Sequence, residues 1–518
     1  MVYKRLNTGD SKNNKWLIAI SAMTPTLVVA LDTSVANVSL THIQGSLSAS
    51  QDEVTWVLTS YIAANAVVIP MSGWLSRLLG RKRYLMASVA IFTVSSMICG
   101  AATGLTEMIL FRIVQGLGGG GLQPMSQAIL LETFPPSQRG LAVGIFGMGI
   151  VVGPILGPLL GGYLTDNYTW RWIFYINVPI GIIALALIFR FIVDPPYLHR
   201  LRGKGTIDAF GLVLLCAGLG SLQIVLDKGQ LDDWFSSNFI TVLSIVAAIC
   251  LTTLVFWELR HKNPIVDLKI FADRSFATSN LVLFFAYFGF FASIVLLPLY
   301  LQTLLGYTAF LAGVVLAVGG AVMLLIFPLV GKLTERMDAR LLLAFGLLMT
   351  GYSTYYMSGF NLEIDIKTAI YSRVILAVGM PFIFVPCSYL MIAYIPKEEM
   401  SNASAIYNLL RNLGSSFGVA FVTTLIARRS QFHQSRLEEH LSPYNPVYAI
   451  YFEELKTFLS QKIGPYADLS ERAENLIYKM LEKQATLLAF DDAFFVLAII
   501  LLGLIATVWI IRKPPSTK

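Results

Sequence analysis

Runs of about 20 consecutive apolar residues recur along almost the whole 518-residue chain, and they limit its fold more than any other feature. A helix of that length crosses a bilayer, where each backbone polar group must be satisfied within its own segment. Hydrophobic residues make up 56% of the sequence and charged residues 13%, against about 45–50% and about 25% in soluble proteins. We therefore expect an all-α polytopic membrane protein, and we exclude disordered, collagen-like and disulfide-rich secreted chains.

The apolar runs predict fourteen transmembrane helices. The first run begins near Trp16, is too long for the h-region of a signal peptide, and is read as a retained span. Most basic residues fall in alternate loops, whereas the short loops on the other face hold only Arg171, Lys228 and Lys367. The positive-inside rule then places both termini, including residues 1–15, in the cytoplasm. The pI near 9.0 reflects this topology, and no nucleic-acid partner is expected.

The two halves of the sequence resemble each other. The segment GWLSRLLGRKRYL (Gly73 to Leu85) matches GKLTERMDARLLL (Gly331 to Leu343), and LFRIVQGLG around Arg112 matches YSRVILAVG around Arg373. This internal similarity predicts two six-helix bundles, at residues 16–195 and 276–511, with an inserted helix pair at 206–260.

One long hydrophilic segment, residues 428–490, is expected on the face away from the cytoplasm, and we predict that it is helical. Asn445 and Pro446 can start one helix that Gly464 ends, and Asp468 with Glu471 can form a capping box for a second. Each helix has an apolar stripe. Two interpretations remain open: a self-packed hairpin over the outer mouth, or a surface that docks a partner protein or the membrane interface.

Ionisable groups inside a bilayer are costly and therefore indicate function. Asp32 lies about 24 Å along the first span, deeper than any other acidic residue. Arg112 enters the fourth span at a comparable depth. We predict that Asp32 is a proton-coupling site, with hydrogen bonding to its neighbours as the structural alternative. Snorkelling to the outer interface is the alternative for Arg112.

Further polar residues lie in the predicted spans. Snorkelling to the cytoplasmic interface is an equal alternative for Arg411. The candidates for lining a substrate cavity are Asn37, Gln115, Gln123, Asn408, Arg411 and Arg373.

The fifth span contains the run GIVVGPILGPLLGG. Glycines at every fourth position share one helix face and let another helix approach closely, and the prolines favour a bend. We predict a sealing interface between the two bundles that opens and closes. Its residues are Gly149, Gly153, Pro154, Gly157, Pro158, Gly161 and Gly162.

Other patterns exclude functions. Gly116 to Gly121 spells GxGxxG, but within a membrane span and without a preceding strand, so a dinucleotide site is not expected. The sequence has no phosphate-binding GxxxxGK[ST], zinc-protease HExxH or nucleophile-elbow motif. The four cysteines fall in apolar runs and are interpreted as small buried hydrophobes. We expect no cofactor, no metal and no enzymatic activity.

These motifs also resemble a known family. GWLSRLLGRKRYL resembles the loop motif of the major facilitator superfamily, and LFRIVQGLGGGG resembles its fourth-span motif. The glycine–proline run is similar to the antiporter motif of its drug exporters, and ALDTSVANVSL and WRWIFYINVPIG resemble the 14-span drug:proton antiporters. The outer segment containing HLSPYNP resembles EmrB-type members.

The resemblance implies proton-driven export of hydrophobic toxic compounds across the inner membrane by alternating access. By position, Asp32 is the coupling and substrate-facing carboxylate and Arg112 is linked to proton transfer. Gly73, Gly80 and Arg81 then belong to a cytoplasmic lock between helices. The family loop motif usually has an acidic residue where Arg77 stands, which leaves the lock in doubt. The resemblance also implies a periplasmic adaptor, facing residues 428–490, and an outer-membrane channel.

The mechanism that follows is a hypothesis. Asp32 takes up a proton from the low-pH side and releases the drug, so that drug and proton compete for one site. With a single deep carboxylate, neutral, weakly acidic or singly charged lipophiles are easier substrates than dications. An uptake symporter of the same fold, or a membrane receptor or scaffold that transports nothing, remains an alternative.

Overall fold

The computed structural model describes residues 11–195, 208–261, 263–442, 444–463 and 468–512. Residues 1–10 of the expected cytoplasmic N-terminus, and the linker at 196–207, lie outside this range. Helices and short 3-10 turns are joined by loops, and no strand occurs in the described ranges. The prediction of an all-α fold is thereby confirmed.

The described residues before the gap at 196–207 form ten α-helices, which we call the N-terminal half. They are α1 (Ser11–Val38), α2 (Leu40–Ser46), α3 (Gln51–Val54), α4 (Trp56–Leu79), α5 (Arg81–Ala101), α6 (Leu105–Gly119), α7 (Leu122–Thr133), α8 (Arg139–Asn167), α9 (Trp172–Tyr175) and α10 (Asn177–Phe191).

The pair α12 (Ala209–Lys228) and α13 (Asn238–Arg260) follows, and then the C-terminal half. This half consists of α14 (Arg274–Thr303), α15 (Ala309–Arg336), α16 (Ala339–Met357), α17 (Ile366–Ile392), α18 (Met400–Glu438), α19 (Pro446–Ile463), α20 (Leu469–Gly503) and α21 (Ile505–Val508).

Among the described residues, 12 helices are long and apolar enough to cross a membrane. The expected count of fourteen is not confirmed. The span predicted near residue 117 is divided at Gly120 and Gly121 into α6 and α7, each too short to cross alone. The span predicted near residue 350 is α16, whose second half, TGYSTYYM, is rich in hydroxyl-bearing side chains.

The break between α6 and α7 also explains the GxGxxG match. A Cβ on Gly116 would lie 2.5 Å from the carbonyl oxygen of Tyr61, and one on Gly118 would lie 2.6 Å from the amide nitrogen of Phe92. These glycines therefore let α6 pack directly on the backbones of α4 and α5.

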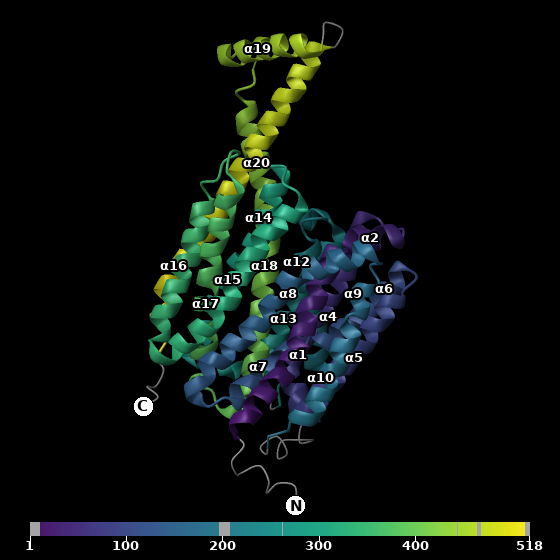
Figure 1. The fold of residues 1–518 in the computed structure, drawn as a ribbon, viewed down its shortest axis with the longest axis vertical. Coiled ribbons are helices and arrows are strands. Elements are labelled where there is room, and N and C mark those ends of the chain that lie inside the picture. The colour runs from purple at the N-terminus through teal and green to yellow at the C-terminus, as the bar shows by residue number, and fades with distance from the viewer. Residues whose placement is uncertain (1–10, 196–207, 262, 443, 464–467, 513–518) are drawn as a thin grey trace, which may run out of the picture.

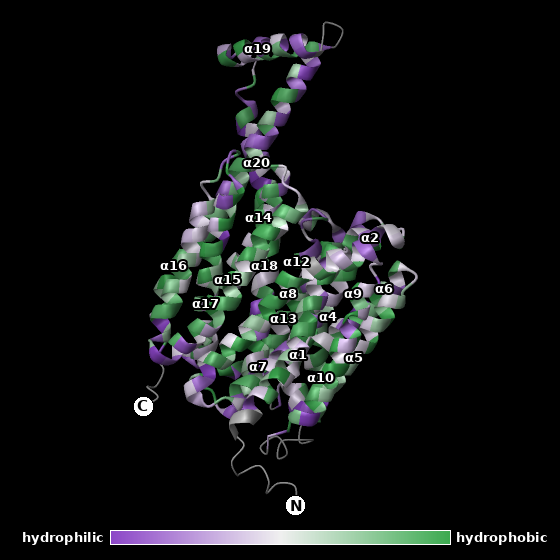
Figure 2. Cartoon of the chain, viewed as in Figure 1, coloured by the Kyte–Doolittle hydropathy of each residue, from purple (hydrophilic) through white to green (hydrophobic). Residues whose placement is uncertain are grey.

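The two halves meet where α8 packs on α15 and α17 and where α4 and α7 pack on α18. Helix α12 contacts both α4 and α18, whereas α13 packs mainly on α12. Exposed apolar side chains cover α13, including Val242, Ile245 and Ile249. Figure 2 shows the same hydrophobic character over the sides of the bundle. Such a surface suits contact with lipid chains rather than water.

The hydrophilic segment forms a helical hairpin that projects from one end of the bundle (Figure 1). Helices α18 and α20 run past the other helices, and α19 lies across their tips and packs on α20. Helix α19 begins at Pro446, and Asp468 caps α20 by accepting a hydrogen bond from Glu471 N at 3.4 Å, so the predicted helices are confirmed. The hairpin stands above the C-terminal half in Figure 1.

The described chain begins and ends at the opposite end of the bundle (Figure 1). We call this the termini end, and the other the hairpin end. Val447, Ile450 and Phe458 on α19 remain 75%, 61% and 51% exposed. The hairpin therefore does not bury the whole apolar stripe by packing on itself.

Candidate functional site: a buried ion pair and an aromatic cavity

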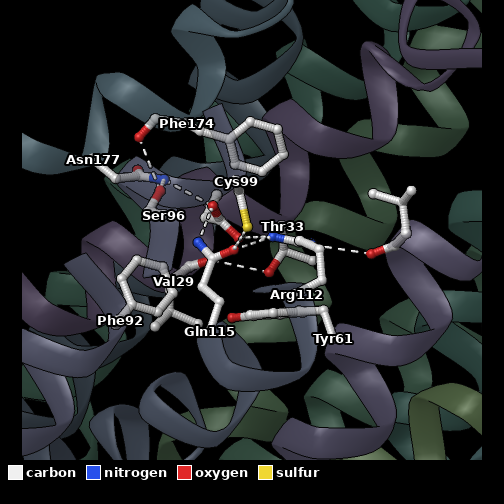
Figure 3. A network of polar contacts seen from close by, with 12 residues as sticks. Val29, Thr33, Tyr61, Phe92, Ser96, Cys99, Arg112, Gln115, Phe174 and Asn177 are labelled. Atoms are coloured by element: carbon white, nitrogen blue, oxygen red, sulfur yellow. Dashed lines mark hydrogen bonds and ion pairs between the residues drawn. The ribbon is translucent and has the colours of Figure 1, made fainter. Parts of the chain in front are cut away.

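Asp32 lies in the second half of α1 and is only 2% exposed. Its carboxylate accepts hydrogen bonds from Arg112 Nη1 at 2.8 Å, Gln115 Nε2 at 2.8 Å and Asn177 Nδ2 at 2.7 Å. Figure 3 shows these donors converging from α6 and α10. A carboxylate removed from water needs such pairing, because an unpaired buried charge is strongly unfavourable.

Arg112 is fully buried and does not snorkel, so the interface alternative is wrong. Its Nη1 also donates to Gln115 Oε1 at 2.8 Å, and its Nε donates to the carbonyl oxygen of Val57 at 3.0 Å. The guanidinium carbon lies 4.2 Å from the ring centroid of Tyr61, a cation–π distance. The contacts come from α4 and α6 as well as α1, so the charge is held by three helices.

A second layer of polar groups supports the ion pair. Asn177 Nδ2 also lies 3.1 Å from Ser96 Oγ, which in turn donates to the carbonyl oxygen of Phe174 at 2.9 Å. The sequence analysis did not identify Asn177, Ser96 or Tyr61 as site residues. A polar side chain inside an apolar span was the signal that could have identified Asn177. Its pairing with Asp32 could not be read from the sequence, because the two residues are 145 positions apart.

The geometry gives Asp32 a defined chemical capability. While ionised, it is matched by the charge of Arg112 and by two amide donors. A proton on this carboxyl group would remove the counter-charge of Arg112 and place a hydroxyl among hydrogen-bond donors. Uptake of one proton would therefore destabilise this arrangement of helices.

A separate cavity of about 90 Å³ lies between α8, α14, α15 and α17. Its wall is mostly aromatic and aliphatic, with Arg373 as the charged member. The rings that line it are Tyr287, Phe290, Phe291, Phe327 and Phe384. Asp32 is not among the lining residues, so the predicted coupling carboxylate does not line this cavity.

The remaining cavity candidates are distributed differently. Arg373 lines the cavity, whereas Gln115 belongs to the Asp32 network. Asn37 is exposed near the end of α1, so the structure does not bring it to the cavity.

Gln123, Asn408 and Arg411 join the two halves. Arg411 Nη2 donates to Gln123 Oε1, and Asn408 Nδ2 donates to Gln127 Oε1 at 2.6 Å. Arg411 is 8% exposed and points into the bundle, so the snorkelling alternative for it is wrong.

The predicted lock residues do meet at the termini end. Gly80 has a φ of 87°, in the region that favours glycine, and it turns the chain so that Arg81 starts α5. Arg81 donates to both oxygens of Glu132, at 2.9 and 2.8 Å, and to Ser401 Oγ in the other half at 2.9 Å. Glu132, which the sequence analysis missed, comes from the end of α7.

Backbone contact accompanies this ion pair. A Cβ on Gly73 would lie 3.0 Å from Asn402 Cα, and one on Gly331 would lie 2.8 Å from the carbonyl oxygen of Gly140. Glu335 Oε1 accepts a hydrogen bond from Leu141 N at 3.2 Å, across the halves. The two halves are therefore in close contact at the termini end.

Arg77 occupies the position where the family motif usually has an acid. Its side chain interacts electrostatically with Asp267 and Glu399, which precede the C-terminal helices α14 and α18. At this contact between the halves, α4 therefore contributes the positive charge, and the segments that precede α14 and α18 contribute the negative charges.

The glycine stripe of α8 does not form the predicted interface between bundles. Added Cβ atoms on Gly149, Gly153, Gly157 and Gly161 would meet α1, which belongs to the same half, while Gly162 faces open space. The contact with α15 is made by glycines nearer the start of α8, namely Gly140, Gly144 and Gly147. Close approach was correctly predicted, but four-residue spacing does not specify the partner helix. The side chains of Pro154 and Pro158 lie outside the described part of the structure.

Comparison with known proteins agrees with this fold. Residues 24–419 match the family model described as Major Facilitator Superfamily. Multidrug export protein EmrB of Escherichia coli (strain K12) is 35% identical over 506 residues, covering 96% of this chain and 95% of that protein. Fatty acid resistance protein FarB of Neisseria gonorrhoeae is 34% identical over 486 residues, covering 94% and 93%.

Solved structures show the same fold at low sequence identity. The proton:xylose symporter XylE is 16% identical with a TM-score of 0.58, over 90% of this chain and 99% of that one. The human organic anion transporter MFSD10 is 12% identical with a TM-score of 0.58, over 95% and 100%. The chain therefore belongs to the major facilitator superfamily of transporters, and EmrB-type multidrug export proteins are among its relatives.

Proposed function

We propose that this protein exports lipophilic toxic compounds across the inner membrane in exchange for protons, by alternating access. The observation that carries the proposal is the buried Asp32 carboxylate, held by Arg112, Gln115 and Asn177. A functional role accounts for keeping two charges deep in a membrane protein, because each costs about 2.5–3.5 kcal/mol on insertion scales. Similarity to multidrug export and fatty acid resistance proteins supports lipophilic substrates.

In the proposed cycle, a proton binds Asp32 and breaks its pairing with Arg112. The arrangement of α1 against α6 and α10 then loses stability, and the protein moves toward its other conformation. The change can reach the second half because α1 packs on the glycines of α8, and the start of α8 packs on α15. Opening must also break the contacts of Arg81 with Ser401 and of Gly140 with Gly331.

Proton and substrate bind at different places in this proposal. Asp32 is enclosed within the N-terminal half, whereas the aromatic cavity is lined mainly by the C-terminal half. Coupling then operates through the conformational equilibrium, as in any linkage between two sites. This replaces direct competition for one carboxylate, because Asp32 does not line the aromatic cavity.

We further propose that both termini are cytoplasmic and that the hairpin of α18, α19 and α20 projects into the periplasm. Exposed Val447, Ile450 and Phe458 offer an apolar surface on α19 to a periplasmic adaptor that leads to an outer-membrane channel. Replacing residues 446–463 with glycine–serine sequence tests this role. We expect unchanged drug-dependent proton flux in liposomes but loss of drug resistance in cells. Loss of flux in liposomes would contradict a docking role.

The coupling proposal is tested in liposomes with an imposed pH gradient and a panel of lipophilic dyes and drugs. Internal pH is followed for the wild type, for Asp32→Asn and for Asp232→Asn, a control with the same chemical change at an exposed position. We expect drug-triggered proton movement in the wild type and the control, and none in Asp32→Asn. Coupled flux in Asp32→Asn would refute the assignment, and accumulation of drug with the protons would indicate uptake instead.

A further inference from the structure

Arg373 is a buried cation at the wall of the aromatic cavity. It lies in α17, is 4% exposed, and donates to Ser293 Oγ at 3.3 Å. Its guanidinium carbon lies 5.3 Å from the ring centroid of Phe290. Its Nε atom is buried and has no hydrogen-bond partner in the described part of the protein. The side chain therefore has capacity for another acceptor.

No carboxylate within the described ranges pairs with Arg373. Two other buried arginines differ, since Arg112 is paired with Asp32 and Arg81 with Glu132. A buried charge without a counter-ion is strongly unfavourable. The cation–π contact and one hydroxyl offset this only in part.

A second cation strengthens the positive potential nearby. Arg411 lies 5.8 Å from the ring centroid of Tyr287, which lines the cavity, and its Nη1 is buried without a partner among the described residues. Gln123, which accepts a hydrogen bond from Arg411, is neutral. The described cavity lining thus contains Arg373 and no carboxylate, and Arg411 lies near Tyr287 in the same wall.

We propose that the cavity at Arg373 receives the anionic head group of a lipophilic acid during transport, with Arg373 as the counter-ion. The inference rests on the proposed export function and specifies its substrate class. The aromatic wall suits an acyl or aryl tail, and the guanidinium suits a carboxylate, sulfonate or phosphate.

The size of the cavity agrees with a head-group site. Its volume of about 90 Å³ is smaller than the roughly 300–1,000 Å³ of pockets that enclose drug-sized ligands. In this conformation it has room for the charged end of an amphiphile but not for a whole one. Separation of α8 from α14, α15 and α17 would admit the rest.

The test compares ligands that differ only in charge. The probes are 11-(dansylamino)undecanoic acid and its methyl ester, titrated by dansyl fluorescence into the protein in phosphatidylcholine nanodiscs, with empty discs subtracted. We expect the acid to bind at least about tenfold more tightly than the ester, because a charge-assisted hydrogen bond contributes about that factor. Equal affinities would overturn the proposal.

Variants locate the effect. Arg373→Gln should abolish the preference for the acid while leaving ester binding unchanged, and Arg373→Lys should retain most of it. Arg190→Gln, the same change at an exposed position, should behave as the wild type. Should Arg373→Gln fail to fold, Ser293→Asp is used instead. It should also abolish the preference for the acid, because it supplies a carboxylate beside Arg373. A preference that survives neutralisation of Arg373 would refute the assignment.

Two further arms separate the possible explanations. Adding one-third phosphatidylglycerol to the discs should not weaken acid binding; strong competition would mean that a lipid head group occupies the site, which overturns its role in transport. Drug-dependent proton flux is measured on the same preparations. Flux with equal binding of acid and ester would overturn only this inference, whereas acid preference without flux would overturn only proton-coupled export.

Discussion

The ion pair of Asp32 and Arg112 should be strongly coupled, and a double-mutant cycle measures this. The single changes are Asp32→Asn and Arg112→Gln. Asp32→Asn can retain one acceptor oxygen, facing Gln115 and Asn177, but it leaves the Arg112 charge buried without a counter-ion. Arg112→Gln leaves the carboxylate unpaired in the same way. Breaking a buried pair costs about 3–5 kcal/mol, which is roughly a hundredfold to several thousandfold in the unfolding equilibrium.

The double variant should be less destabilised than either single variant. With both charges removed, two neutral amides remain, and these can hydrogen-bond to each other. We expect a loss of no more than about 2 kcal/mol, because exchanging a whole buried ion pair for neutral groups is much less costly than breaking it. The coupling energy should therefore exceed the range of about 0.5–3 kcal/mol found for ordinary neighbouring residues.

The assay is reversible unfolding in mixed micelles with increasing SDS, followed by circular dichroism. The exposed pair Glu453 and Lys456, 3.0 Å apart on α19, is the matched control, with changes to Gln at both positions. Its single variants should lose no more than about 1 kcal/mol. Two results would refute this reasoning: additive effects of the changes at Asp32 and Arg112, or single-variant losses as small as those of the control. Either result would mean that water stabilises the charge that remains after its partner is removed.

Other contacts make separate predictions. Gly153→Ala should lower the unfolding free energy by about 1–3 kcal/mol because its Cβ meets the backbone of α1, whereas Gly162→Ala, with nothing within 4 Å, should not lower it. Arg81→Gln should cost about 1.5–3 kcal/mol in the same SDS assay by removing both hydrogen bonds to Glu132, and a smaller loss would contradict a buried bidentate pair. Gly331→Val should separate α15 from α8. Cysteines introduced at the termini end should then be labelled faster, and an unchanged labelling rate would contradict the prediction.

The placement of charges in the structure changes the interpretation of mechanism. Local sequence identified Asp32, Arg112 and Arg373 as unusual because each is ionisable within an apolar span. It did not distinguish a paired charge from an unpaired one. Asp32 proved to be matched by three donors, while Arg373 has no carboxylate partner in the described ranges. Under the proposal made above, the substrate-binding role therefore belongs to the arginine rather than to the acid.

The sequence by itself determined the fold class, the helical hairpin and the depth of the charged residues. These follow from local physical chemistry: the length of apolar runs, the capping of α20 by Asp468 and the starting position of α19 at Pro446. Bilayer thickness and backbone hydrogen bonding constrain each segment separately, so no partner needs to be known.

Only the tertiary structure decided which helices meet. The α8 glycine stripe packs on α1 rather than on the other half, and Asn177 reaches Asp32 across 145 residues. The sequence of a helix can show that one face permits close approach, but it does not specify which neighbour packs there. Packing between membrane helices depends on shape and on polar contacts that the partner helix supplies. The separation of the buried ion pair from the aromatic cavity is a property of that packing.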